Sequence, residues 1–323
     1  MQSILDPAIL FFAFGIFAGM IKSNLDIPPQ LSRFLSLYLL MALGLKGGFA
    51  LAHSGLTPQI VSSLGCAILL AVLVPALGYQ LLKRFINHYD AAAIAATYGS
   101  VSAVTFITAV QYLENHHLTY GGHMAAAMAL MESPAIIMAV IFANTLRKKS
   151  ASGSPHPTSL SKVLHESLTD GAQLLLLGSM VVGIISGESG KAAMQPFSGD
   201  LFKGMLAFFL LDMGLMAARK LPEIKGQSPW IIVYAVVTPL CHAALALGLA
   251  CLLKLPAGDA SLLMVLAASA SYIAVPAVLR YTIPEANPSL YLGMSLGITF
   301  PLNIFLGIPL YIAIAHQVIG VGS

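Results

Sequence analysis

Charge is scarce in this sequence of 323 residues, in which Asp, Glu, Lys and Arg together make up only 9%. A soluble domain carries about 25% charged residues. Hydrophobic residues instead make up 58% of the chain, and the mean hydropathy is +0.85. This composition excludes a soluble globular protein and provides no basic surface for a nucleic acid. The chain is therefore predicted to be an all-α integral membrane protein whose main surroundings are the lipid bilayer.

Motifs for metals, nucleotides and covalent catalysis are also absent. The three cysteines lie in apolar segments, where a cysteine is most often a small buried hydrophobic residue. The sequence has no CxxC or HExxH spacing and no GxxxxGK[ST] loop. We therefore predict no cofactor, no metal site of these types and no direct use of ATP. A membrane enzyme is a further hypothesis, but no nucleophile and base are paired at membrane depth.

Ten apolar segments are long enough to cross a bilayer, since a span needs about 20 apolar residues. They cover approximately residues 4–22, 31–52, 58–83, 90–112, 121–146, 168–187, 198–219, 229–253, 259–280 and 288–316. The longest polar connection, rich in Ser and Pro, bisects the chain into five segments on either side. We predict a first repeat over 1–150, a linker over 151–166 and a second repeat over 167–323.

The loops between these segments differ in their basic residues. Loops on one side hold twelve of the sixteen Lys and Arg residues, loops on the other side hold three, and Lys46 lies within a span. Because cytoplasmic loops carry the excess of Lys and Arg, the linker is predicted to be cytoplasmic and both termini to be outside. The expected location is therefore a plasma membrane, which the chain crosses several times.

The two halves of the chain resemble each other at a nearly constant offset. Asp90 corresponds to Asp259 at an offset of 169, and the Leu-Gly-Leu of 43–45 corresponds to the Met-Gly-Leu of 213–215 at an offset of 170. Five spans per half is an odd number, so the second half must enter the membrane from the opposite face. The pattern predicts an inverted-topology repeat, which places two related half-sites near the middle of the membrane.

The fourth and ninth spans are both interrupted in their middle by small and polar residues. A pair of interrupted segments in corresponding positions of two halves indicates a transporter's binding site. Exposed N–H groups at the start of a half-helix favour an anion, and nearby hydroxyls add hydrogen bonds. The alternative is that these serines bond to the preceding turn and only allow close packing. The candidate substrate residues from this pattern are Gly99, Ser100, Ser102, Thr105, Ser269 and Ser271.

Glu132 in the fifth span is an acid at membrane depth, which is energetically expensive and indicates a functional site. It could bind a cation, take up a proton, or bond to backbone groups freed by Pro134. The corresponding region of the second half has no acid and carries Asn303 instead, so the cation site is predicted to be asymmetric. The candidate cation residues are Glu132, Ser102, Ser271 and Asn303.

Lys46 and Asp212 are predicted buried charges in the second and seventh spans. A direct ion pair between them requires both side chains to lean towards the middle of the membrane. Otherwise each of them snorkels to the interface or caps a helix break near a glycine.

Several stretches together resemble the sodium-dependent bicarbonate transporters of the SbtA type. They are LGLKGG (43–48), YGSVSAVTF (98–106), MESPAIIMAVIFAN (131–144), LLDMGLMAARKL (210–221) and IPEANPSLYLG (283–293). Their order is preserved, and they extend over nearly the whole chain.

This resemblance implies ten spans in two inverted repeats, with spans 1, 2, 6 and 7 forming a gate domain and spans 3–5 and 8–10 forming a moving core. It implies a homotrimer, an elevator-like movement, and a PII-like regulatory protein as a possible partner. Bicarbonate and sodium would bind where spans 4 and 9 cross, which adds Ala270 and Tyr272 to the substrate residues. Tyr272 stands where family members carry an aspartate, and Glu132 matches an aspartate of the family.

The leading hypothesis is thus secondary active uptake of bicarbonate with sodium. The alternatives are transport of another small anion, coupling to protons through Glu132, and an anion-binding membrane sensor that moves nothing.

Overall fold

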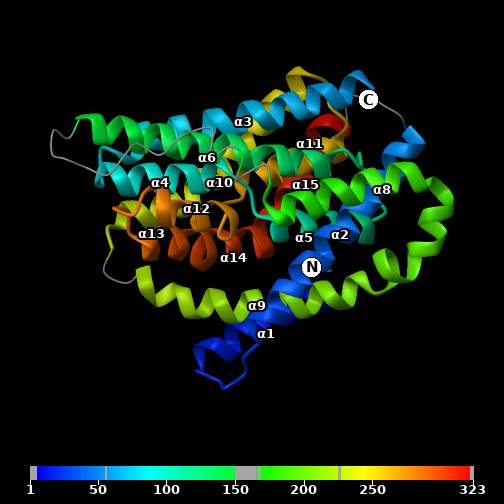
Figure 1. Cartoon of the computed structure of the whole chain (residues 1–323), viewed down its shortest axis with the longest axis horizontal. Helices are drawn as coiled ribbons and strands as arrows, with labels where there is room; N and C mark the ends of the chain where they lie inside the picture. Colours follow the sequence, from blue (N-terminus) through cyan, green and yellow to red (C-terminus); the bar gives the residue numbers. More distant parts are fainter. Residues whose placement is uncertain (1–5, 55–56, 150–164, 166–168, 225–226, 321–323) are drawn as a thin grey trace.

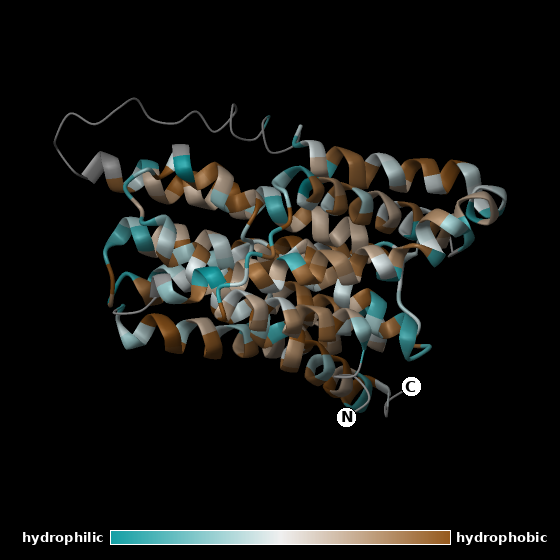
Figure 2. Ribbon diagram, turned by 90° about the horizontal axis from the view of Figure 1, so that it is seen from below, coloured by the Kyte–Doolittle hydropathy of each residue, from teal (hydrophilic) through white to brown (hydrophobic). Residues whose placement is uncertain are grey.

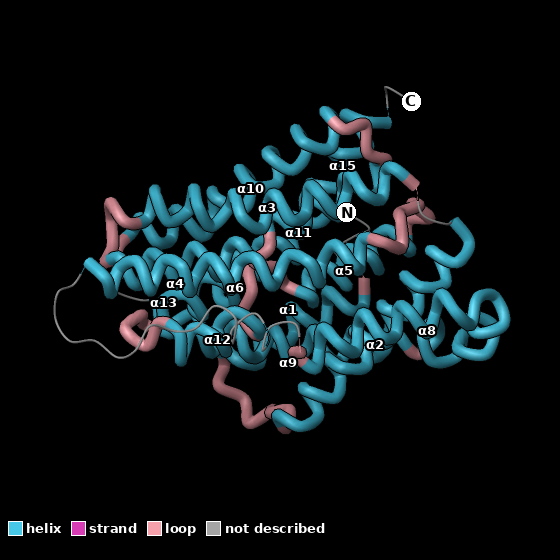
Figure 3. Tube along the Cα trace, turned by 45° about the horizontal axis from the view of Figure 1, so that its top comes forward, coloured by secondary structure: helices cyan, strands magenta, loops and turns pink. Residues whose placement is uncertain are grey.

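A computed structural model of the chain describes residues 6–54, 57–149, 165, 169–224 and 227–320, and every regular element in these residues is a helix (Figure 3). The linker predicted for 151–166 lies outside the described residues except for position 165. The α-helices are α1 (Pro7–Met20), α2 (Pro29–Ser54), α3 (Pro58–Leu82), α4 (His88–Gly99), α5 (Ala103–Asn115), α6 (Met124–Lys149), α8 (Gly171–Met194), α9 (Phe202–Lys220), α10 (Pro229–Leu252), α11 (Ala257–Ala268), α12 (Ala274–Thr282), α13 (Pro288–Leu292), α14 (Phe300–Leu302) and α15 (Ile308–Gly320). Shorter turns of other types are η2 (Gln195–Asp200), η3 (Leu221–Ile224), η4 (Gly293–Thr299) and η5 (Asn303–Gly307).

Seven stretches of the described chain are long and apolar enough to cross a membrane. One of them, Gly171–Lys220, runs through two of the predicted spans, while Pro7–Met20 and Ala257–Ala268 are shorter apolar helices. Hydrophilic residues gather towards the two ends of the long helices and hydrophobic residues along their middles (Figure 2). The helices thus occupy all ten predicted segments, and a multi-pass membrane protein is supported.

The fourth and ninth segments are broken at the predicted residues. α4 ends at Gly99 and α5 begins at Ala103, while α11 ends at Ala268 and α12 begins at Ala274. The residues between the halves are largely extended, and small polar side chains there offer the backbone other partners than the helix ladder. Each break therefore leaves helix ends inside the protein rather than at its surface.

The helices pack in two groups (Figure 1). The first helix group contains α1, α2, α8 and α9, in which α1 packs along α9 and α2 packs along α8. The second helix group contains α3–α6 and α10–α15, in which α3 packs on α4 and α10 packs on α11.

Glycines bring the helices of the first group unusually close. A Cβ atom at Gly48 of α2 would lie 2.2 Å from the carbonyl oxygen of Met180 and 2.8 Å from the Cα of Gly183, both in α8. A Cβ atom at Gly214 of α9 would lie 2.3 Å from the carbonyl oxygen of Phe12 and 3.0 Å from the Cα of Gly15 in α1. Small residues let membrane helices approach in this way, so that van der Waals packing holds the pairs together.

Two corresponding aspartates anchor the broken segments. Asp90 in α4 accepts a hydrogen bond of 2.7 Å from the backbone N–H of Asn287, which precedes α13. Asp259 in α11 accepts one of 2.6 Å from the N–H of Gly121, which precedes α6, and lies 3.4 Å from Nε2 of His123. Sequence analysis matched the two aspartates without predicting this role, and it missed His123.

Candidate functional site

The two helix breaks contact each other directly in the interior of the protein. The backbone N–H of Ser271 donates to the carbonyl oxygen of Thr97 over 2.9 Å, and the N–H of Ser102 donates to Oγ of Ser269 over 3.0 Å. Each break thus satisfies backbone groups of the other, and a buried polar group without a partner would be costly. The contact fixes the two half-helix junctions side by side.

Ser102 and Ser271 each accept hydrogen bonds from the first turn of the half-helix that follows. Oγ of Ser102 accepts hydrogen bonds from the N–H and the hydroxyl of Thr105, at 3.2 and 2.9 Å. Oγ of Ser271 accepts a hydrogen bond of 3.2 Å from the N–H of Val275. Ser102 is the N-cap of α5, whereas Ser271 lies three residues before α12 and bonds to the first turn of that helix. The first turns of both half-helices, with their partial positive charge, therefore begin near the junction.

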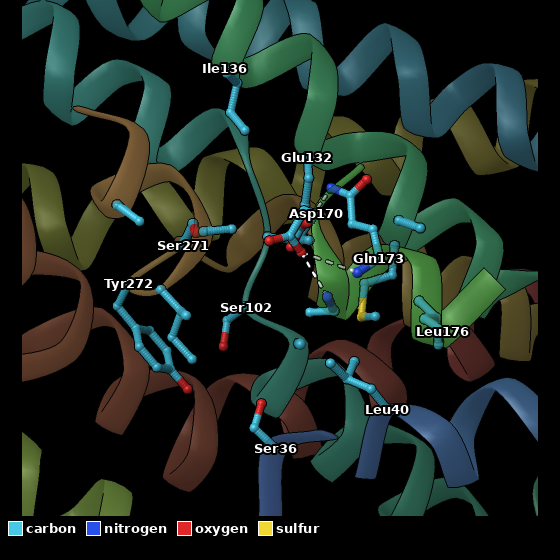
Figure 4. A pocket seen from close by; sticks show the side chains of 18 of the residues that line it. Ser36, Leu40, Ser102, Glu132, Ile136, Asp170, Gln173, Leu176, Ser271 and Tyr272 are labelled. Carbon is cyan, nitrogen blue, oxygen red and sulfur yellow. Dashed lines mark hydrogen bonds between the residues drawn. The ribbon is translucent and has the colours of Figure 1, made fainter. Parts of the chain in front are cut away.

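A cavity of about 300 Å³ opens at this junction. Ser102 and Ala103 line it from one break, and Ser271, Tyr272 and Ala274 line it from the other. Figure 4 shows Tyr272 on one side of this space and Gln173 on the other, with Ser102 between them. The remaining wall comes from α6, α2 and the start of α8, with Glu132, Ile136, Ser36, Leu40, Asp170, Gln173 and Leu176 among its residues. The cavity therefore lies between the two helix groups.

Glu132 is one of the cavity residues and joins the two groups. Its Oε2 accepts a hydrogen bond from Nε2 of Gln173, which is 6% exposed (Figure 4). Asp170 caps α8 by accepting from the N–H groups of Ala172 and Gln173, at 3.0 and 3.2 Å. Carboxylate oxygens of Glu132 and Asp170 and the hydroxyls of Ser102 and Ser271 therefore surround the same cavity. Oxygen donors of this type suit hard cations.

Sequence analysis did not predict Gln173, Asp170 or Ser36 as site residues. In the sequence, these residues are only polar positions near the start of an apolar segment. Polar residues at such positions are equally expected where a span simply meets the membrane surface. What places them at the site is the position of one helix group relative to the other.

Of the predicted substrate and cation residues, Ser102, Ser271, Tyr272 and Glu132 line the cavity. The others, namely Gly99, Ser100, Thr105, Ser269, Ala270 and Asn303, do not line it. Gly99 packs on Pro75, whose ring would lie 2.5 Å from a Cβ atom at this position. Ser269 donates its hydroxyl to the carbonyl of Leu266 over 2.8 Å and thereby holds the break together. Gly99 and Ser269 thus stabilise the junction of the two breaks without facing the cavity.

Asn303 bonds to the backbone near the second break. Its Nδ2 donates to the carbonyl oxygen of Ala268, the last residue of α11, over 2.8 Å, and its Oδ1 accepts from the hydroxyl of Tyr311 over 3.1 Å. Asn303 thus satisfies a carbonyl that the helix break has freed. Asn303 is the first residue of the π-helical turn η5, and such turns within helices are frequent at functional sites.

The possible ion pair between Lys46 and Asp212 is not formed. Nζ of Lys46 lies 3.0 and 2.9 Å from the two carboxylate oxygens of Glu114, at the end of α5. Asp212 is 5% exposed and lies in α9 without an ion pair to Lys46. The prediction paired charges within the first helix group, whereas Lys46 reaches across to the second.

The described residues contain no group of three or more His, Cys, Asp and Glu side chains that could hold a metal ion. A search of the curated proteins finds no match to the chain. A family model does match residues 7–316, and it describes the Na+-dependent bicarbonate transporter superfamily. This match extends over nearly the whole chain and agrees with an all-helical architecture that is rich in apolar spans. The chain belongs to the Na+-dependent bicarbonate transporter superfamily.

Proposed function

We propose that this chain is a secondary active transporter that takes up bicarbonate together with sodium. The observation that carries the proposal is the cavity of about 300 Å³. The N-terminal ends of α5 and α12 both lie at its wall, and Glu132 lines it as well. The same observation favours residues Ser102, Ala103, Ser271 and Tyr272 as the anion-binding set. Family membership supports the choice of bicarbonate and sodium.

The anion would bind at the N-terminal turns. Ala103 and Ala274 are the first residues of their half-helices and lie at the cavity wall. Their N–H groups belong to the first helical turn, in which backbone donors have no partner within the helix. The hydroxyl of Tyr272 has no partner among the described residues and adds a further donor. An anion about as small as bicarbonate fits these converging donors.

The sodium ion would bind beside the anion, where Glu132 supplies a negative charge and Ser102 and Ser271 supply neutral oxygens. Tyr272 cannot supply a second negative charge at neutral pH, since a tyrosine has an unperturbed pKa of about 10. Asn303 would act behind this site by holding the carbonyl of Ala268 in place. We therefore propose that sodium coupling depends on Glu132 and is weaker than it would be with an aspartate at position 272.

The architecture that we propose is ten spans in two inverted repeats. It is supported by the equivalent anchors of Asp90 and Asp259, by the hydrogen bonds that Ser102 and Ser271 accept from the half-helices that follow them, and by the way α1 pairs with α9 while α2 pairs with α8. In this scheme the first helix group is the gate domain and the second is the moving core. An elevator-like movement of the core in a homotrimer, in a bacterial plasma membrane with both termini outside, completes the proposal.

The relative height of the two groups supports an inward-facing state. The cavity meets the gate at Ser36, seven residues into α2, and at Gln173, two residues into α8. Both helices begin on the side that the Lys and Arg distribution assigns to the cytoplasm. The site is thus level with the inner part of the gate.

Uptake of labelled bicarbonate into proteoliposomes tests the function. We expect an inward sodium gradient to drive accumulation, and equal sodium on both sides to abolish it. Accumulation driven by a proton gradient alone would favour proton coupling through Glu132. Binding of bicarbonate without any uptake would favour a sensor.

A further inference from the structure

A salt bridge links the two helix groups far from the cavity. Lys46 of α2 pairs with both carboxylate oxygens of Glu114, at 3.0 and 2.9 Å, and the two side chains are 18% and 31% exposed. Each of the two also has a partner within its own group. The ammonium group of Lys46 lies 4.1 Å from the centroid of the Phe202 ring in α9, and Glu114 accepts a hydrogen bond of 3.0 Å from the hydroxyl of Tyr120. Lys46 therefore stays with the gate, while Glu114 and Tyr120 belong to the core.

The salt bridge lines a second cavity, which has a volume of about 850 Å³. Its wall includes His53, Lys191, Gln195 and Lys203 from the ends of helices that the charge distribution places on the outer side. Lys191 and Glu188 form a separate, well-exposed ion pair of 3.6 Å in this wall. The charged and polar lining of this open cavity gives solutes from outside access to Lys46.

The position of Lys46 along α2 relates it to the binding site. The cavity at the helix breaks now faces Ser36 and Leu40 of α2. Lys46 follows these residues by ten and six positions, which corresponds to roughly 15 and 9 Å along the helix. A rise of the core by such a distance would bring Ser102 and Ser271 level with Lys46 and would carry Glu114 outward beyond it.

We propose that Lys46 is an anion-binding residue of the outward-facing state, and that Glu114 occupies it while the core is lowered. This inference rests on the proposed function, because it requires a core that moves and an anion that enters from outside. Bicarbonate carries a planar carboxylate group like that of Glu114, so one ammonium group binds both in the same manner. Lys46 thus alternates between a carboxylate of the core and the carboxylate of the substrate.

Burial in an apolar gate suits such an exchange. A partly buried lysine left without a counter-charge is energetically unfavourable, so Glu114 leaves only when another anion can replace it. Burial and the carboxylate of Glu114 raise the pKa of Tyr120, so its hydroxyl remains a hydrogen-bond donor to Glu114 at physiological pH. A core without bound anion would accordingly move outward from the inward-facing state less readily than a core that carries bicarbonate.

Two substitutions that both remove the salt bridge separate this inference from a purely structural role. Lys46→Met removes the bridge and the proposed anion contact, whereas Glu114→Gln removes only the bridge. We expect the KM for external bicarbonate to be about tenfold higher in Lys46→Met than in Glu114→Gln, and Lys46→Arg to restore most of the difference. The KM for bicarbonate efflux, measured from the inner side, should be the same in both variants, since Lys46 does not contact the inward-facing site.

Lys191→Met is the matched control, because it removes a lysine of the same cavity from an exposed pair. Its external KM should equal that of the native chain; a rise as large as that of Lys46→Met would show a general electrostatic effect and overturn the inference. Equal external KM values in Lys46→Met and Glu114→Gln would overturn it as well. Should Lys46→Met fail to fold, Lys46→Gln takes its place in the comparison. If the native chain moves no bicarbonate, the proposed function fails and this inference fails with it, whereas the outcomes above contradict the inference alone.

Discussion

The close crossing of α2 and α8 allows the packing of the first helix group to be tested. Replacing Gly48 by alanine would place a Cβ atom 2.2 Å from the carbonyl oxygen of Met180, whereas ordinary contact begins at 3.4 Å. The two helices must therefore separate by about 1.2 Å or bend, because packed interiors have little free space to absorb an added methyl group. Overpacking of this kind costs roughly 1–3 kcal/mol, and we expect the variant to lose that much stability.

Gly178→Ala is the matched control in the same pair of helices. A Cβ atom there meets nothing within 4 Å, so only the higher helix propensity of alanine acts. That propensity is worth up to about 1 kcal/mol and is common to both variants, so the difference between them reports the clash at Gly48. The assay is thermal unfolding in detergent, with transport measured on the same preparations. Equal melting temperatures for Gly48→Ala and Gly178→Ala would show that the close approach at Gly48 does not limit stability.

The remaining predictions concern the site itself. Leucine at Ser102 or Ser271 should abolish bicarbonate binding without changing the oligomeric state in size-exclusion chromatography, and normal binding by both variants would reduce these serines to packing residues. Glu132→Gln should raise the sodium concentration needed for half-maximal uptake by about tenfold or more, since charged hydrogen bonds contribute roughly 1.5–3 kcal/mol; an unchanged sodium dependence would leave Glu132 a structural role. Tyr272→Asp should lower that sodium concentration, because it adds a negative charge at the cavity, and a folded variant with unaltered sodium and bicarbonate dependence would place Tyr272 outside the site.

The helix breaks could be predicted from sequence because their cause is local. A glycine and two serines at 99–102, repeated as serines at 269 and 271, weaken a helix wherever they occur. The match between the two halves then indicated that both breaks matter, and the structure shows that they touch.

The partners of charged residues could not be predicted in the same way. Lys46 pairs with Glu114 rather than Asp212 because of how the two helix groups pack against each other, and this packing involves many residues. The same packing brings Gln173 to Glu132. Sequence periodicity defines which segments cross the membrane, but it contains little information about how one group of helices is placed against another.

We expect bicarbonate to bind in the cavity where the two broken helices meet. The most direct measurement is the protection of a cysteine at Ala103, which lines this cavity, in a chain whose Cys66, Cys241 and Cys251 have been replaced. We predict that bicarbonate slows the modification of Ala103→Cys by a small thiol reagent, at lower concentrations in sodium than in potassium, and that chloride does not. Modification at the same rate with and without bicarbonate, in a variant that still transports it, would show that bicarbonate binds outside this cavity.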